Sequence, residues 1–186
     1  MRNGVRVVML VIPLLAGCGQ HGSAQAPSPS ASSTTPAPPI SGAGSNRCAT
    51  AQLQFSLGPA NAATGNYIAT VSVVNRSGPA CYLGGYPGVE LLDAGGHHLQ
   101  DATRSTDSFF GSYPPSHRVD FPPGGSSSFD LTWGGNDPCG GTPAQQGASM
   151  KVTPPGAYDS ATIAAHLTVC PNSLTVHPLG SRPQQG

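Results

Sequence analysis

The chain has 186 residues and no net charge at neutral pH, and only 9% of its residues are charged. Soluble domains usually carry about 25% charged residues, and a nucleic-acid partner requires clustered lysine and arginine. The 25 glycines and 20 prolines disfavour helical bundles and coiled coils. We therefore expect one non-helical domain that binds no nucleic acid.

The first residues have the features of an export signal. A basic start precedes an apolar run from Val7 to Ala16, which is too short to cross a bilayer as a helix. The following Leu15-Ala16-Gly17-Cys18 resembles the bacterial lipobox, which implies cleavage before Cys18 and attachment of lipid to its sulfur. We expect residues 1–17 to be a lipoprotein signal peptide, and the protein to be lipid-anchored on the extracytoplasmic side of the cell membrane. The alternative is an ordinary secretory signal followed by a chance cysteine.

Residues 18–45 contain the lipidated Cys18 and then mostly Ser, Ala, Pro, Thr and Gly, with one branched apolar residue, Ile40. Such a composition buries too little apolar surface to offset the conformational entropy of the chain. We expect a disordered tether that holds the domain away from the membrane. At the other terminus, residues 179–186 are expected to form a flexible tail.

Between residues 46 and 178, short runs rich in β-branched and aromatic residues alternate with Gly and Pro turns. Leu53, Phe55 and Leu57 fall on one face of a predicted strand, as do Phe129, Leu131 and Trp133 of another. The pattern predicts an all-β fold, an immunoglobulin-like antiparallel β-sandwich of eight or nine short strands. A closed barrel is the alternative. The predicted strands cover residues 52–57, 67–74, 89–92, 98–100, 118–121, 126–133, 149–153, 163–170 and 174–177.

Four cysteines remain once Cys18 is assigned to lipid, and an even number in an exported chain indicates disulfides. If the strands at 52–57 and 67–74 form an antiparallel hairpin, the cysteines that flank them meet, which predicts Cys48–Cys81. The same argument for the strands at 149–153 and 163–170 predicts Cys139–Cys170. A four-cysteine zinc site is disfavoured because no Cys-x-x-Cys pair is present.

Part of the sequence resembles a domain of unknown function, numbered 4232, that occurs in secreted actinobacterial proteins. The resemblance is carried by the stretch Cys81-Tyr82-Leu83-Gly84-Gly85-Tyr86-Pro87-Gly88-Val89. Further matches extend it over residues 46–178, at Cys48, 75–79, 92–93, 95–96, 123–125, 129–133 and Cys139. The resemblance implies an extracytoplasmic β-sandwich, often behind a lipobox and a tether, and brings no catalytic residues.

Catalytic or metal chemistry has little support in the sequence. His97, His98 and His117 lie near acidic residues, which makes metal handling the alternative function. Neighbouring histidines of a strand point to opposite faces, however, so we expect solvated side chains, no metal and no cofactor. Without a Gly-x-Ser-x-Gly motif, a hydrolase is disfavoured and we expect no enzyme activity.

The segment from Ser105 to Ser116 is a hydrophilic loop that carries Phe109, Phe110 and Tyr113. Aromatic side chains dominate binding hot spots, so we expect these three to form a recognition surface. The alternative is that Phe109 and Tyr113 fold back into the sandwich. The sequence thus predicts a monomeric envelope lipoprotein whose non-catalytic β-sandwich binds an unknown protein, glycan or small ligand.

Overall fold

Fourteen β-strands and one turn of 3₁₀ helix, Thr50–Gln52, make up residues 46–184, the part of the chain that the computed structural model describes. The expected signal peptide, the lipidation site Cys18, the tether up to residue 45 and the last two residues lie outside this part. Within it, no helix is long and apolar enough to cross a membrane.

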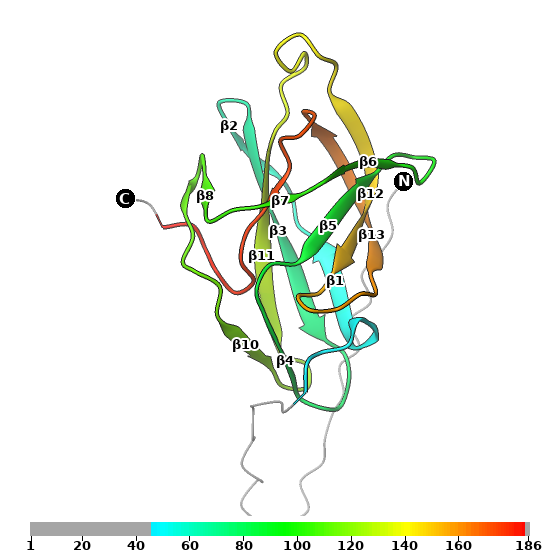
Figure 1. The fold of residues 1–186 in the computed structure, drawn as a ribbon, viewed down its shortest axis with the longest axis vertical. Coiled ribbons are helices and arrows are strands. Elements are labelled where there is room, and N and C mark those ends of the chain that lie inside the picture. The colour runs from blue at the N-terminus through cyan, green and yellow to red at the C-terminus, as the bar shows by residue number, and fades with distance from the viewer. Residues whose placement is uncertain (1–45, 185–186) are drawn as a thin grey trace, which may run out of the picture. The chain divides into compact units, whose positions relative to one another are not determined.

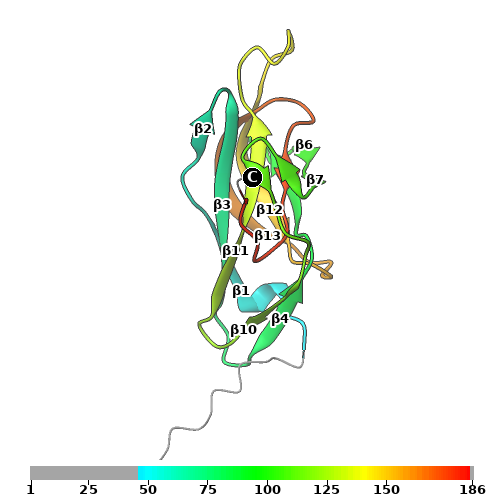
Figure 2. The same ribbon diagram turned by 90° about the vertical axis from the view of Figure 1, so that its left-hand side faces the viewer.

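Two sheets form the layers of a β-sandwich (Figures 1 and 2). The larger sheet has the order β1-β3-β11-β14-β7, with β2 beside β3. The smaller has the order β13-β12-β5-β6. In the larger sheet the strands are β1 Leu53–Leu57, β2 Asn61–Ala63, β3 Asn66–Asn75, β7 Thr103–Arg104, β11 Ser126–Gly134 and β14 Thr175–Val176. In the smaller they are β5 Gly88–Leu92, β6 His98–Asp101, β12 Gln145–Thr153 and β13 Ala161–Val169.

Two further strand pairs lie beside these sheets. β4 (Cys81–Gly84) pairs with β10 (Arg118–Phe121) at the lower end of the sandwich in Figure 1. β8 (Asp107–Ser108) pairs with β9 (Gly111–Ser112) at its side. β11 runs along much of the sandwich (Figure 1). It starts at the end of the sandwich near β4 and β10 and finishes at the end near β2.

The inner faces of the two sheets form one hydrophobic core. The alternation predicted for β1 is present, since Leu53 and Phe55 are buried and Gln54 and Ser56 are exposed. Opposite them, the smaller sheet contributes Leu91, Met150 and Val152, all fully buried. Burying side chains of this size stabilises the fold by about 1.5–3 kcal/mol each.

All nine strands expected from the sequence are present, and the predicted all-β sandwich is confirmed. Of the five additional strands, β2, β7, β8 and β9 have only two or three residues and no large apolar one, so hydrophobic periodicity does not reveal them, and β4 is hydrophobic but only four residues long. The strands are antiparallel with one exception, the short pair β7 and β14, which is parallel.

Both predicted disulfides are present. Cys48 is bonded to Cys81 and Cys139 to Cys170. The hairpin argument holds in each case, because β1 pairs with β3 and β12 pairs with β13 in antiparallel register. The first bond ties the start of the domain to β4, and the second ties the β11–β12 loop to the end of β13.

The expectation of a flexible tail from residue 179 is wrong for the described part of that segment. Leu179 is fully buried, and Ser181 is only 3% exposed. The backbone N–H of Gly180 donates to the carbonyl of Ser128 on β11, and Gln184 pairs with Ser112 on β9. The leucine supplies apolar area and the backbone hydrogen bonds hold the segment in place, so the domain extends at least to Gln184.

Candidate binding site

Other segments of the chain cover the outer face of β11, and hydrogen bonds to one buried carboxylate hold them there. Asp130 is 2% exposed although it lies on the face of β11 opposite the core residues Phe129 and Leu131. Its Oδ1 accepts hydrogen bonds from the hydroxyl of Thr70 at 2.7 Å and from the guanidinium of Arg182 at 3.0 Å, and its Oδ2 accepts from the Tyr113 hydroxyl at 3.2 Å. A buried charge is tolerated only when it is paired and hydrogen-bonded in this way.

His177 is a second buried side chain at the outer face of β11. It is fully buried, and its ring stacks on Tyr113 with the centroids 3.9 Å apart. Nδ1 lies 2.9 Å from the carbonyl oxygen of Ser105, which can only accept, so Nδ1 carries the proton. Nε2 therefore accepts from the hydroxyl of Thr132, 2.9 Å away. Burial lowers the pKa of His177, although the Ser105 hydrogen bond and the charge of Asp130 act in the opposite direction.

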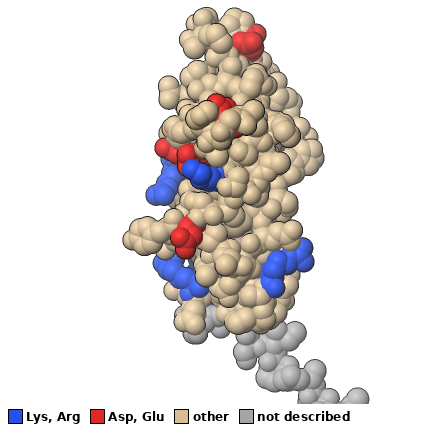
Figure 3. Space-filling view, turned by 90° about the vertical axis from the view of Figure 1, so that its right-hand side faces the viewer, with Lys and Arg blue, Asp and Glu red and all other residues tan. Residues whose placement is uncertain are grey.

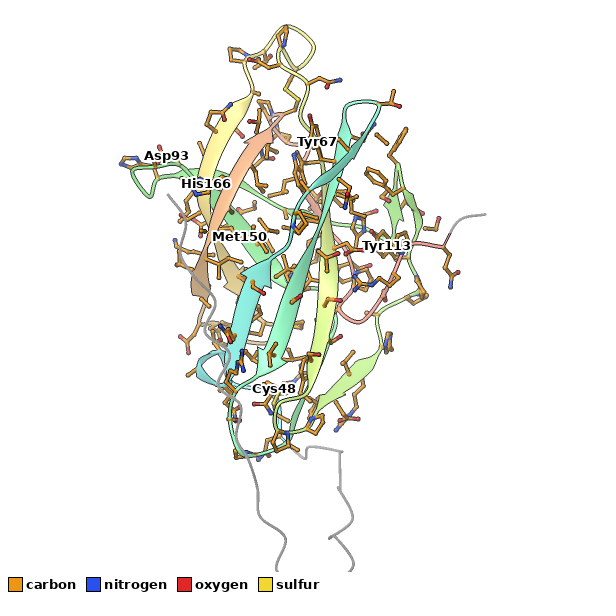
Figure 4. The ribbon with its side chains drawn as sticks, turned by 180° about the vertical axis from the view of Figure 1, so that it is seen from behind. Cys48, Tyr67, Asp93, Tyr113, Met150 and His166 are labelled. Atoms are coloured by element: carbon orange, nitrogen blue, oxygen red, sulfur yellow. A yellow bond between two sulfur atoms is a disulfide. The ribbon has the colours of Figure 1, made fainter. Side chains whose placement is uncertain are left out.

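These contacts correct the prediction for Tyr113. The sequence placed it on an exposed recognition surface with Phe109 and Phe110, but its side chain is only 4% exposed. Burial, followed by the nearby charge of Asp130, raises the pKa of Tyr113. Figure 4 shows Tyr113 beside the C-terminal segment at the flank of the sandwich. Tyr113 therefore anchors the hairpin and is not part of its exposed surface.

Phe109 and Phe110 form the tip of a tight hairpin. They join β8 to β9, and the Ser108 hydroxyl closes the turn by donating to the carbonyl of Gly111 and accepting from the N–H of Phe110. Phe109 is 60% exposed and packs edge-to-face on Phe110, which is half-buried. Gly111 has a φ of +126°, and a Cβ there would lie 2.5 Å from the carbonyl oxygen of Gln184. Instead of a long open loop, the structure has a hairpin held against the C-terminal segment.

A cavity of about 290 Å³ lies between this hairpin, β11 and β14. Two aromatic residues of the hairpin, Phe109 and Phe110, line it, and Trp133 on β11 belongs to its wall while its indole packs in the core. Trp133 is fixed by stacking on Tyr67 and by its indole N–H, which donates to the carbonyl of Thr168. The polar residues that line the cavity are Asn66, Asp107, Ser108, Thr132, Ser173 and Thr175. This combination suits a small group with an apolar face and hydrogen-bonding edges.

A larger cavity of about 670 Å³ adjoins it, and the two share Asn66 and Gly134. Loop backbone around the Cys139–Cys170 disulfide forms most of its wall, and its lining contains no charged and no aromatic residue. It offers little specific chemistry by itself, but it leaves room beside the aromatic cavity for a longer ligand.

The histidines considered for metal binding do not come together. His97 belongs to the β5–β6 turn, where its backbone N–H and Nδ1 contact the carboxylate of Asp93. The hydrogen bond from that backbone N–H lowers the pKa of Asp93. His98 pairs with Asp101 at 3.5 Å, and His117 lies elsewhere, beside β10. Residues 46–184 contain no group of three or more potential metal ligands.

Asp130, His177 and Arg182 are not revealed by sequence patterns. A charged residue within an alternating strand is an ordinary outward-facing position, and nothing local shows that it will be covered. The one local signal was the apolar Leu179 next to His177 and Pro178, which marks a segment able to pack rather than a tail.

We predict that replacing the buried Tyr113 and replacing the exposed Phe109 have very different effects on the stability of the protein. Tyr113→Ala should lower the free energy of unfolding by about 3–5 kcal/mol, because it removes a buried ring. Phe109→Ala should change it by less than about 0.5 kcal/mol, because the side chain is exposed. Urea unfolding of the two variants beside the wild type measures both values, and equal effects would contradict the assignment of anchor and tip.

We also predict that His177 makes stability depend on pH. Its pKa is lowered in the folded protein, so below about pH 6.5 the unfolded chain gains a proton that the folded chain does not. The contribution of neutral His177 to the free energy of unfolding should be fully present above this pH. The free energy of unfolding should therefore fall as the pH drops from 7 to 5. His177→Gln should flatten this dependence in urea unfolding series.

The exposed His166, on β13, provides the matched control (Figure 4). His166→Gln should retain the wild-type dependence on pH. If the wild type and His177→Gln lose stability in parallel between pH 7 and 5, the buried imidazole is not the group responsible.

Comparison with known protein families identifies the domain. The model of the family "Domain of unknown function (DUF4232)" matches residues 48–180, which is more than two thirds of the chain. The match includes both disulfides, the hairpin and Asp130. No curated protein matches the sequence. The chain thus belongs to the DUF4232 family of domains of unknown function.

Proposed function

We propose that the protein is a lipid-anchored, extracytoplasmic envelope lipoprotein whose non-catalytic sandwich binds a protein or glycan through the cavity beneath the β8–β9 hairpin. The observation that carries the binding proposal is the exposed Phe109, held at the tip of an anchored hairpin above an aromatic cavity. Apart from Tyr158, it is the one large hydrophobic side chain of residues 46–184 that is exposed.

The rigidity of the hairpin supports this role. Its first flank is tied to β14, since Ser105 donates its N–H to Val176 and accepts from His177. Its second flank is tied to β11 through Tyr113 and Asp130. An aromatic tip that is already ordered loses little conformational entropy on binding, which favours affinity.

The size of the cavity restricts what enters it. Ligand pockets usually measure about 300–1,000 Å³, and this one, at about 290 Å³, is at the lower limit. It accommodates one sugar ring or one side chain, and the rest of the ligand continues into the adjoining larger cavity. Asp107 and Asn66 supply an acceptor and an amide for the hydroxyl or amide groups of such a ligand.

The anchoring part of the proposal rests on the sequence. Cys18 follows the small residues that resemble a lipobox, and the two disulfides are consistent with an oxidising compartment. Two or more acyl chains on this residue would hold the protein stably on the membrane.

One crosslinking experiment in intact cells tests both parts. A photoreactive phenylalanine analogue at position 109 should capture a specific envelope protein or glycan in the membrane fraction. The same analogue at Tyr158, which is fully exposed in the β12–β13 loop, is the matched control and should not capture it. Phe110→Ala should reduce capture at position 109 at least tenfold, as loss of a hot-spot contact does.

The Cys18→Ser chain should leave the membrane fraction or accumulate uncleaved. Equal capture at positions 109 and 158 would refute binding at the hairpin. A cleaved Cys18→Ser chain that stays on the membrane would refute lipid anchoring.

A further inference from the structure

A second cavity, unrelated to the hairpin, lies near the opposite end of β11, where the chain joins the sandwich. It measures about 260 Å³, and among its lining residues are Arg47, Tyr82, Gly84, Gly85, His117 and Arg118. The whole chain contains only eight Lys and Arg residues, and Figure 3 shows one face of the molecule on which basic groups are few and some adjoin acidic ones. Two arginines around one small cavity are therefore an unusual concentration of basic side chains for this protein.

Strand register brings these groups together. Residues 46–48 run alongside β4, because Cys48 donates its N–H to the carbonyl of Tyr82 and Tyr82 donates to Asn46. Arg47 is therefore bridged to Tyr82 on one side of β4, while on the other side Arg118 lies opposite Gly84. Both guanidinium groups pack against the same Tyr82 ring, at 5.5 Å for Arg47 and 3.8 Å for Arg118. The Cys48–Cys81 disulfide fixes this arrangement covalently.

None of the residues that line the cavity is acidic, but Asp120, just outside it, forms an ion pair with Arg118 at 2.8 Å. Arg47 forms no ion pair with any described carboxylate, and its Nη1 donates only a long hydrogen bond of 3.4 Å to the carbonyl of Pro155. Arg118 is oriented by Asp120, whose Oδ1 accepts from Nε at 3.0 Å and from Nη2 at 2.8 Å. Asp120 itself does not line the cavity.

Glycine allows β4 and β10 to approach each other closely at the cavity wall. Gly84 lies directly opposite Arg118 in the register of these two strands. A Cβ at this position would lie 3.0 Å from the carbonyl oxygen of His117, which is tighter than normal packing. Gly85 has a φ of +118°, a conformation that other residues rarely adopt. At these two glycines the cavity wall is therefore backbone without side chains, and Tyr82 and Leu83 line the rest of β4.

We propose that this cavity binds a phosphate-class oxyanion, either free phosphate or the phosphodiester of a headgroup. Guanidinium groups match tetrahedral oxyanions because their planar N–H donors bond two oxygens at once. Stacking on Tyr82 orients both arginines in advance, which lowers the entropic cost of binding. The site does not depend on ligand binding at the hairpin.

Titration of the purified full-length chain, followed by nuclear magnetic resonance, tests this proposal. Inorganic phosphate is added at constant pH and ionic strength, with chloride as the reference salt. We expect saturable shifts of the Arg47 and Arg118 Nε–H signals and of the Gly84 and Gly85 amides. Arg47→Gln and Arg118→Gln should each weaken binding at least tenfold. The matched control is Arg76→Gln, which removes an arginine that contacts Gln54 and does not line the cavity.

A second arm distinguishes the two sources of the oxyanion. Glycerophosphoglycerol presents a phospholipid phosphodiester without acyl chains, and tighter binding of this probe than of inorganic phosphate would assign the site to headgroups. Tighter binding of inorganic phosphate would assign it to the free ion. If the shifts are linear for both probes, are the same in chloride, or persist in the Arg47→Gln and Arg118→Gln variants, the proposal is overturned.

Discussion

The hydrogen bonds to the buried carboxylate of Asp130 are the interactions on which the outer face of β11 depends. An unpaired charge at this position would be strongly destabilising, so the fold must bring donors to it. The donors come from three separate segments: Thr70 from β3, Tyr113 from the hairpin flank and Arg182 from the C-terminal segment. One charge thus holds together parts of the chain that hydrophobic burial alone would leave loosely attached.

This arrangement explains how a short two-stranded hairpin can present aromatic side chains. An isolated hairpin is marginally stable in water, and one with two residues in each strand has little to hold it together. Here Tyr113 and His177 stack beneath it, and Thr132 connects His177 to the cavity lining. Buried groups next to the hairpin therefore stabilise its ordered conformation, and Phe109 at its tip remains exposed.

The sequence predicted those features that depend on local patterns. Alternation at Leu53 and Phe55 located β1, and the spacing of the cysteines around two hairpins was sufficient to assign both disulfides. The outer face of β11, with the β8–β9 hairpin and the C-terminal segment, was predicted less well, because it is built from contacts between distant segments. Tyr113 and Phe109 are four residues apart in the same polar stretch, and only the position of Asp130 and His177 decides which of them is buried. The arginines of the second cavity, Arg47 and Arg118, are 71 residues apart in the numbering and meet only through Tyr82.

Native-state hydrogen exchange of the Asp130→Asn variant tests the central role of this carboxylate most directly. The change keeps the shape of the side chain and removes its charge. The central role of Asp130 predicts that the backbone amides of Tyr113, Gly180 and Gln184 lose protection from exchange together. The amides of Met150 and Val152 in the opposite sheet should keep their protection. Unchanged protection of the hairpin and the C-terminal segment, or an equal loss in both sheets, would contradict it.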